Sequence, residues 1–252
     1  MLRLYIQAPF AVFRTFTAGW YRPTATFLTP SAAYGLALNL AGIETRRDDG
    51  LSAMTLTQFG LPPARIALGA VADDSRGAFP TVQSIFQQLH NYPVGASGKE
   101  RKEDAKGSKY NITPVRREFL ADLRAIVVFD FFEKNAWVED RMRQALNGKS
   151  PKSATRYGLP FLGDNAFLID KLEVRDKPVH AHWFCTVGKD DGPSSHSTRL
   201  TIWVDRQDMS RTESALFAPI ESAIAEPPES AWTLIKPPPN PSPPTKRPGT
   251  KG

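Results

Sequence analysis

The chain has 252 residues, of which 41% are hydrophobic, enough for one sizeable core or two small ones. Its net charge of +6 is uneven: the residues after position 235 supply +4, which leaves +2 for residues 1–235, so nucleic-acid binding must depend on local patches. A single cysteine, Cys185, excludes an intramolecular disulfide and a zinc cluster built on cysteines. No stretch reaches the roughly 18 apolar residues of a membrane span, so we expect a cytoplasmic protein without membrane contact.

The N-terminal segment combines aromatic and basic side chains. A strand is predicted over 2–6, and residues 10–43 contain Phe13, Arg14 and Arg22 but no acidic residue. Stacking rings beside guanidinium groups are what a protein uses to hold single-stranded nucleic acid. We therefore predict that these three residues bind RNA.

A well-specified helix start follows the aromatic loop. Thr29 can cap the helix with its hydroxyl, Pro30 suits the first helical position, and residues 31–33 are expected to leave N–H groups for a phosphate. Thr29 and Ser31 are therefore candidate RNA-binding residues. An ordinary first helix packed on a strand explains the same pattern, since Leu36, Leu40 and Ile43 share one face.

Further along the chain, apolar runs predict strands over 65–71, 124–130 and 167–174, and a helix over 136–146. The order β-α-β-β-α-β is the ferredoxin-like plan, which is also that of the RNA-recognition motif. About fifty residues separate the second and third strands, too many for an idle loop. Apolar runs at 179–184 and 199–204 predict a small C-terminal β extension.

The chain resembles the Cas-five family, the subunit that holds the 5′ end of the CRISPR RNA in type I interference complexes, and within it the DevS-like branch. The resemblance covers most of residues 1–175. It rests on four strings, APFAVFRTFTAGWYRPTATFLTPSAAYGLALNLAGIE (8–44), QQLHNYPVG (87–95), YNITPVRREFL (110–120) and GLPFLGDN (158–165).

The resemblance, together with the apolar runs and the proline content of the C-terminal region, predicts an α+β chain in three parts. Residues 1–175 are expected to form a ferredoxin-like RNA-binding domain, and residues 176–225 a β extension. A thumb hairpin is expected over about 80–120, although Val82, Ile85, Phe86 and Leu89 have helical spacing. Its tip, 95–108, has the composition of a solvated loop. The proline-rich segment 226–252 is predicted to be a disordered tail, with docking into an aromatic groove as the alternative.

The resemblance also implies RNA contacts at the thumb base, where Arg116 and Arg117 follow each other. Adjacent strand residues face opposite ways, so only one can point toward a given ligand. Ion pairs with Glu118 or Asp122 are the alternative for this pair. Arg46 and Arg47, in a predicted exposed turn, are further RNA-binding candidates.

Two other stretches remain open. Residues 141–157 hold five basic side chains and no acid, and can meet a phosphate, an acidic partner subunit or neither. The glycines of 158–165 suit a tight turn that also permits close approach to RNA.

The sequence gives little support to catalysis. It contains no Walker-type loop, no G-x-S-x-G motif and no carboxylates at metal spacing, and we expect no cofactor and no metal. His180 and His182 share a strand face, where a structural role is the simpler interpretation. One branch of the family cuts the CRISPR RNA precursor with a tyrosine and a lysine–histidine pair, and no Lys-His dipeptide occurs here.

We therefore expect a non-catalytic subunit of a type I RNA-guided surveillance complex (Cascade) that caps the 5′ handle of the CRISPR RNA. Its expected partners are that handle, the Cas-seven backbone subunit, the Cas-eight large subunit and, through the complex, target DNA. Two alternatives stay open: a metal-independent endoribonuclease with a general base such as His90, and a purely architectural subunit.

Overall fold

The computed structural model describes residues 1–15, 20–50, 55–72, 77–93, 110–148, 159–164, 166–188, 192 and 196–238. Its helices are α1 (Pro30–Leu40) and α2 (Trp137–Leu146), with short 3-10 helices at Glu133–Asn135, Met209–Arg211 and Glu229–Ala231. Its strands are β1 (Leu2–Ala11), β2 (Tyr21–Arg22), β3 (Arg46–Arg47), β4 (Leu56–Thr57), β5 (Ala64–Ala70), β6 (Thr81–Pro93), β7 (Tyr110–Asp130), β8 (Lys171–Val174), β9 (His182–Thr186), β10 (Thr198–Trp203), β11 (Glu213–Pro219) and β12 (Trp232–Ile235).

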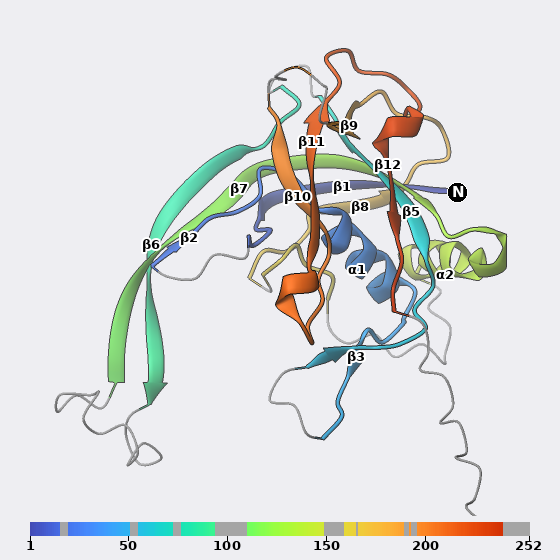
Figure 1. Cartoon of the computed structure of the whole chain (residues 1–252). Helices are drawn as coiled ribbons and strands as arrows, with labels where there is room; N and C mark the ends of the chain where they lie inside the picture. Colours follow the sequence, from blue (N-terminus) through green and yellow to red (C-terminus); the bar gives the residue numbers. More distant parts are fainter. Residues whose placement is uncertain are drawn as a thin grey trace, which may run out of the picture.

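One large sheet dominates the molecule (Figure 1). At its centre the strands lie in the order β8-β1-β7-β5, and each neighbouring pair is antiparallel. β9, β11 and β10 continue the sheet beyond β5, so the predicted C-terminal extension shares a sheet with the N-terminal region. Alternation sets the register: Leu2, Leu4 and Ile6 are fully buried, whereas the residues between them are partly exposed. The chain is an α+β protein.

Helix α1 packs against the sheet, where it contacts β5 and β10 (Figure 1). The Thr29 side chain caps it by accepting from the Ala32 N–H, as the sequence predicts. Most of its side chains are buried, and the Tyr34 O–H donates to the Pro62 carbonyl at 2.7 Å. Burial raises the pKa of Tyr34. What remains open on α1 is a narrow stripe that includes the exposed Gly35.

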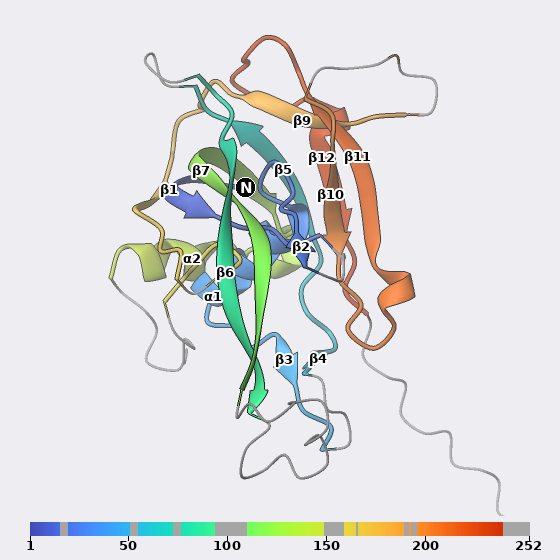
Figure 2. The same cartoon turned by 90° about the vertical axis from the view of Figure 1, so that its left-hand side faces the viewer.

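The expected thumb is a hairpin of β6 and the first half of β7. The two strands pair antiparallel from Thr81 opposite Ala121 to Pro93 opposite Tyr110, and they extend away from the body of the sheet (Figures 1 and 2). Strand pairing therefore overrides the helical spacing of the apolar residues in β6. The predicted tip, 95–108, lies outside the described residues.

The prediction of a disordered tail from residue 226 is wrong for its first part. β12 pairs antiparallel with β5, from Trp232 opposite Ala67 to Ile235 opposite Ala64. Ile235 is fully buried and Thr233 nearly so, because the short apolar run between the prolines completes the core beside β5. The Gly60 N–H donates to the Pro238 carbonyl at 3.2 Å, and residues 239–252 lie outside the described part.

Within the described residues, no helix has both the length and the apolar character needed to cross a membrane.

Candidate nucleic-acid interface

The Glu118 carboxylate attaches the loop that follows β1 to the base of the thumb. β2 runs parallel to β7, with Tyr21 opposite Arg116 and Arg22 opposite Arg117. Glu118 accepts from the Tyr21 O–H through Oε1 and from the Thr24 N–H through Oε2, the latter at 3.1 Å. The hydrogen bond with Glu118 raises the pKa of Tyr21. The aromatic loop is therefore held against β7 by strand pairing and by the Glu118 side chain.

An aromatic–arginine row crosses three strands at this point. Phe86 of β6 lies opposite Arg116 of β7, which lies opposite Tyr21 of β2, so the three side chains share one face. Phe86 is 80% exposed and Tyr21 47% exposed, and the Arg116 guanidinium carbon lies 5.5 Å from the centre of the Tyr21 ring. Trp20, next to this row, is 76% exposed. We call Phe86, Arg116 and Tyr21 the thumb-base row.

The opposite face of β7 has different chemistry. Arg117 donates to Asp164 through Nη2 and to Gln87 Oε1 through Nη1 at 3.2 Å. Arg14 Nη2 lies 3.9 Å from the same Asp164 oxygen. The backbone N–H of Ala166 and the Arg117 guanidinium lower the pKa of Asp164. One carboxylate thus connects the first loop, the thumb and the 159–164 turn.

The two arginines of this face differ in what they can bind. The Arg117 side chain is only 13% exposed and is held by Asp164 and Gln87, whereas the Arg14 side chain is 61% exposed. A phosphate can reach Arg14 without breaking a close ion pair, but it has to displace Asp164 to reach Arg117. Arg14 is therefore the better phosphate ligand, and Arg117 positions the structure.

A cluster of rings supports that face. Phe10 contacts Phe119 edge-to-face at 5.4 Å and Phe167 at 6.0 Å between centroids, and Arg117 lies 5.8 Å from the Phe167 ring centre. Phe10 is 43% exposed. The aromatic residues that reach the surface here are thus Phe10 and the thumb-base rings.

Phe13 was the wrong aromatic residue to choose. It is 3% exposed and belongs to the main core, and its N–H donates to Thr24 Oγ1 at 2.9 Å. Its ring cannot stack on a base. The sequence pattern could not distinguish the ring that anchors the loop in the core from the rings that the loop exposes.

The remaining predicted residues lie in separate places. At the helix start, the Ala32 and Ala33 N–H groups already donate to Thr29, so they are not left for an anion as predicted; the Thr29 and Ser31 hydroxyl oxygens lie 3.1 Å apart. Arg46 and Arg47 form β3, which pairs with β4 in a separate two-stranded sheet, where Arg46 is ion-paired with Glu44 and Arg47 lies 4.4 Å from the centre of the Phe59 ring.

Two residues were not found from the sequence. Phe86 carried helical spacing and gave no sign that it would be exposed on a strand. Asp164 belongs to the glycine turn motif and carries no separate signal in the sequence, yet it contacts both Arg14 and Arg117. The sequence offers one indication for Asp164: it is a single carboxylate in a glycine-containing turn, and the chain contains many arginines with which it can pair.

The described residues offer no group of three or more histidine, cysteine, aspartate or glutamate side chains placed to hold a metal ion. The His182 Nδ1 lies 3.0 Å from the Ile220 carbonyl oxygen, as the structural interpretation requires, whereas the His180 side chain is exposed. The side chain of His90, and Lys149, Lys152, Arg156, Gly158 and Asn165, lie outside what the structure describes.

The chain is an α+β protein with a projecting hairpin and an aromatic–arginine surface at the base of that hairpin. Comparisons with known proteins identify its family. Residues 1–147 match the family described as "CRISPR-associated protein (Cas_Cas5)", and the chain belongs to that family. It is similar in fold to a solved chain described as "CRISPR RNA-guided surveillance complex", at 16% identity and a TM-score of 0.52, over 90% of this chain and 94% of that one. No curated protein matches it.

Proposed function

We propose that this chain is a non-catalytic subunit of a type I CRISPR RNA-guided surveillance complex (Cascade), in which it binds and caps the 5′ handle of the CRISPR RNA. The family membership and the described complex of the structural neighbour support the assembly. The observation that carries RNA binding is the thumb-base row, where two exposed rings flank a guanidinium group. Rings of this kind stack on splayed bases, and the arginine takes a phosphate.

The geometry suits a bound strand that passes across the base of the thumb. The thumb-base row lies on one face of β7, and Arg14 lies with Arg117 and Asp164 on the other. Bases stacked on the thumb-base row and a phosphate bound at Arg14 then hold the RNA end on both faces of β7. Such a grip accounts for a capped end better than for a passing chain.

We also infer the ferredoxin-like arrangement for the central four strands. The order β8-β1-β7-β5 with antiparallel neighbours is the order expected when a β-α-β-β-α-β chain folds in that way, and the helix after β1 and the helix after β7 contact each other. In chain order, the second and third of these strands are β5 and β7. The thumb is then an elongation of the connection between them.

Through this position the subunit would anchor its neighbours. We propose that it contacts the Cas-seven backbone subunit and the Cas-eight large subunit, and meets target DNA only through the assembled complex, where guide pairing supplies the sequence specificity.

The experiment is to purify the assembled complex, sequence its RNA, and measure binding of that RNA's labelled 5′ handle at two salt concentrations. One RNA species with a constant 5′ sequence is expected. Arg14→Ala and Arg116→Ala should each weaken handle binding roughly tenfold or more, because a charge-assisted hydrogen bond is worth about 1.5–3 kcal/mol. Random 5′ ends, or wild-type affinity in both variants, would refute the proposal.

The second candidate, a metal-independent endoribonuclease, has an equally direct test. Precursor RNA is incubated with the purified protein in EDTA. Cleavage that a histidine substitution abolishes would replace the non-catalytic role proposed above. His180→Ala and His182→Ala are expected to leave RNA binding unchanged, since His182 is engaged by the Ile220 carbonyl.

A further inference from the structure

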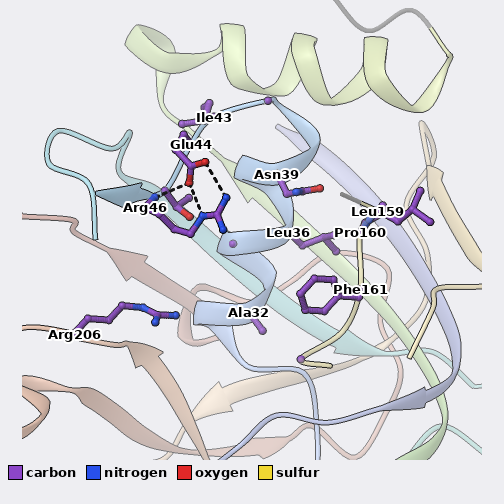
Figure 3. A pocket seen from close by; sticks show the side chains of 14 residues that line it. Ala32, Leu36, Asn39, Ile43, Glu44, Arg46, Leu159, Pro160, Phe161 and Arg206 are labelled. Atoms are coloured by element: carbon purple, nitrogen blue, oxygen red, sulfur yellow. Dashed lines mark hydrogen bonds and ion pairs between the residues drawn. The ribbon is translucent and has the colours of Figure 1, made fainter. Parts of the chain in front are cut away.

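A groove of about 420 Å³ crosses helix α1, away from the thumb-base row. Figure 3 shows its layout: α1 forms the floor, the 159–163 segment forms one wall, and Arg46 and Arg206 approach from the other side. Its volume falls within the range of small-ligand pockets. None of the residues assigned to RNA above accounts for it, except Arg46 at its rim.

One wall of the groove is an exposed apolar surface. Phe161 is 46% exposed and Leu159 is 69% exposed, and both line the groove. Facing them, α1 contributes Gly35, where an added Cβ would meet no atom within 4 Å. The surface of α1 at Gly35 is therefore open, and the exposed Phe161 ring offers a face for stacking.

Two arginines lie at the groove, and they differ in whether a carboxylate neutralises them. Arg46 is bound by Glu44 through two hydrogen bonds of 3.0 and 3.1 Å, which lower the pKa of Glu44 and neutralise the pair. Arg206 is exposed and, within the described part of the chain, makes no ion pair or hydrogen bond. It is thus the cation of the groove that is available to an anion.

Asn39 supplies an unused polar atom. Its side chain lines the groove, and its Oδ1 is buried without a hydrogen-bond partner. A buried acceptor without a donor costs free energy, and a rotation of the Asn39 side chain that turns Oδ1 into the groove would let a ligand N–H remove that cost. A carboxamide offers both a donor and an acceptor, which is the pattern that a nucleobase edge complements.

The groove adjoins the arginine face of the thumb base through a single turn. Asp164, which contacts Arg14 and Arg117, directly follows the groove residue Gly163. Gly163 is fixed against the end of β1, because a Cβ there would lie 1.6 Å from the Val12 carbonyl oxygen. A nucleic-acid strand whose phosphate is at Arg14 therefore has a short path to the groove.

We infer that this groove holds one unpaired nucleotide of the bound RNA, with its base stacked on Phe161, its base edge at Asn39 and its phosphate near Arg206. The inference rests on the proposed RNA binding and adds a base-selective position to it. The anion-binding arginines retain any RNA, whereas this groove distinguishes the presence and identity of one base.

The test uses synthetic RNA of the 5′ sequence recovered from the complex, made with one abasic position at a time. Wild-type complex should lose affinity about 5- to 100-fold at one position that depends on the groove. In Phe161→Ala the intact RNA should bind weaker by the same factor, and removal of that base should cause no further loss. Phe161→Tyr should restore stacking and with it the abasic effect.

Trp137→Ala, which removes a similarly exposed ring from α2, is the matched control and should bind RNA as wild type does. If Arg116→Ala weakens binding while Phe161→Ala does not, the groove inference fails and the proposed function stands. If Phe161→Ala, Arg14→Ala and Arg116→Ala all bind RNA as wild type does, both the inference and the proposed function fail. If Phe161→Ala impairs assembly with protein subunits at unchanged RNA affinity, the groove is a protein interface and the inference is overturned.

Discussion

Two carboxylates, Glu118 and Asp164, determine where the cationic and aromatic side chains of the candidate interface lie. Glu118 holds Tyr21 and Thr24 on one side of β7, and Asp164 holds Arg117 on the other. Neither is a plausible ligand for an RNA phosphate, because like charges repel. Their role is to position the neighbouring tyrosine and arginine side chains.

At Asp164 we predict a pH-dependent contribution to stability. The folded-state pKa lies below the usual value of 3.8, so the stabilisation is present above pH 3.8 and is lost as the pH falls through the lower folded value. Asp164→Asn should therefore lower the free energy of unfolding by about 1.5–3 kcal/mol at neutral pH. Urea unfolding from neutral pH down to about pH 3 measures it, and the difference from wild type should shrink below pH 3.8. An equal difference at every pH would contradict this.

At Glu118 we predict a local effect on the first loop. Glu118→Ala removes the acceptor of the Thr24 N–H, which then exchanges its hydrogen roughly tenfold faster, since one such bond to a charged group is worth about 1.5–3 kcal/mol. Hydrogen–deuterium exchange of a peptide covering residues 20–25 measures this. Glu229→Ala, which removes an 84% exposed glutamate paired with Arg65, is the control and should leave that peptide unchanged.

Sequence reasoning identified residue types better than residue positions. Arg14 and Arg116 are exposed, whereas Phe13 is in the core and the Ala32 and Ala33 N–H groups are used by Thr29. The reason is physical. Whether a ring in a loop is buried depends on partners far along the chain, such as the pairing of β2 with β7, and no local pattern encodes these.

At the scale of elements, the turn at 159–164 is tightly constrained at Gly163. Gly163 has a φ of +78°, and its Cβ position is occupied by the Val12 carbonyl oxygen. The turn is fixed to the end of β1 by the Val12 N–H, which donates to the Leu162 carbonyl at 3.1 Å. The groove and Asp164 therefore share one rigid support.

We predict that Gly163→Ala destabilises the fold by about 3 kcal/mol or more, because the backbone of β1 or of the turn has to move. Thermal or urea unfolding measures it. Gly50→Ala is the matched control: its φ is +69°, but nothing lies within 4 Å of the added Cβ, so only the conformational cost of about 1 kcal/mol is expected. Similar losses in the two variants would show that the close approach to Val12 is unimportant.

The elements themselves were predictable to different degrees. Strands and helices with strong periodicity, such as β1, β5 and α1, appear where their patterns place them. β6 appears as a strand against its helical spacing, because pairing with β7 along the hairpin outweighs local preference. β12 was missed because its four residues lie between prolines, which dominate the composition of that region.

At the scale of the whole molecule, the net charge is small, whereas the main sheet extends over most of the chain. Residues 1–235 carry a net charge of only +2, so the proposed RNA binding depends on local groups such as Arg14 and Arg116 and not on a general positive field. The sheet, by contrast, is continuous from β8 to β10, and β12 is one of its members although it lies near the C-terminus.

Two truncations separate the part of the C-terminal region that belongs to the fold from the part that does not. Deleting 239–252 should leave stability and handle binding nearly unchanged, apart from a loss of nonspecific, salt-sensitive attraction due to its three basic residues. Deleting 229–252 also removes β12, with the fully buried Ile235, and should cost about 3 kcal/mol or more, because burial of one such side chain alone is worth about 1.5–3 kcal/mol.

Urea unfolding of both truncated chains and handle binding at two salt concentrations provide the measurements. Equal stability of the two chains would mean that β12 adds nothing to the sheet, in conflict with its pairing along β5. Loss of assembly at moderate salt after the shorter deletion would instead identify 239–252 as a docking segment. The expected pattern, a stable first chain and a destabilised second, places the C-terminal boundary of the folded unit between residues 235 and 239, because the Pro238 carbonyl still accepts from the Gly60 N–H.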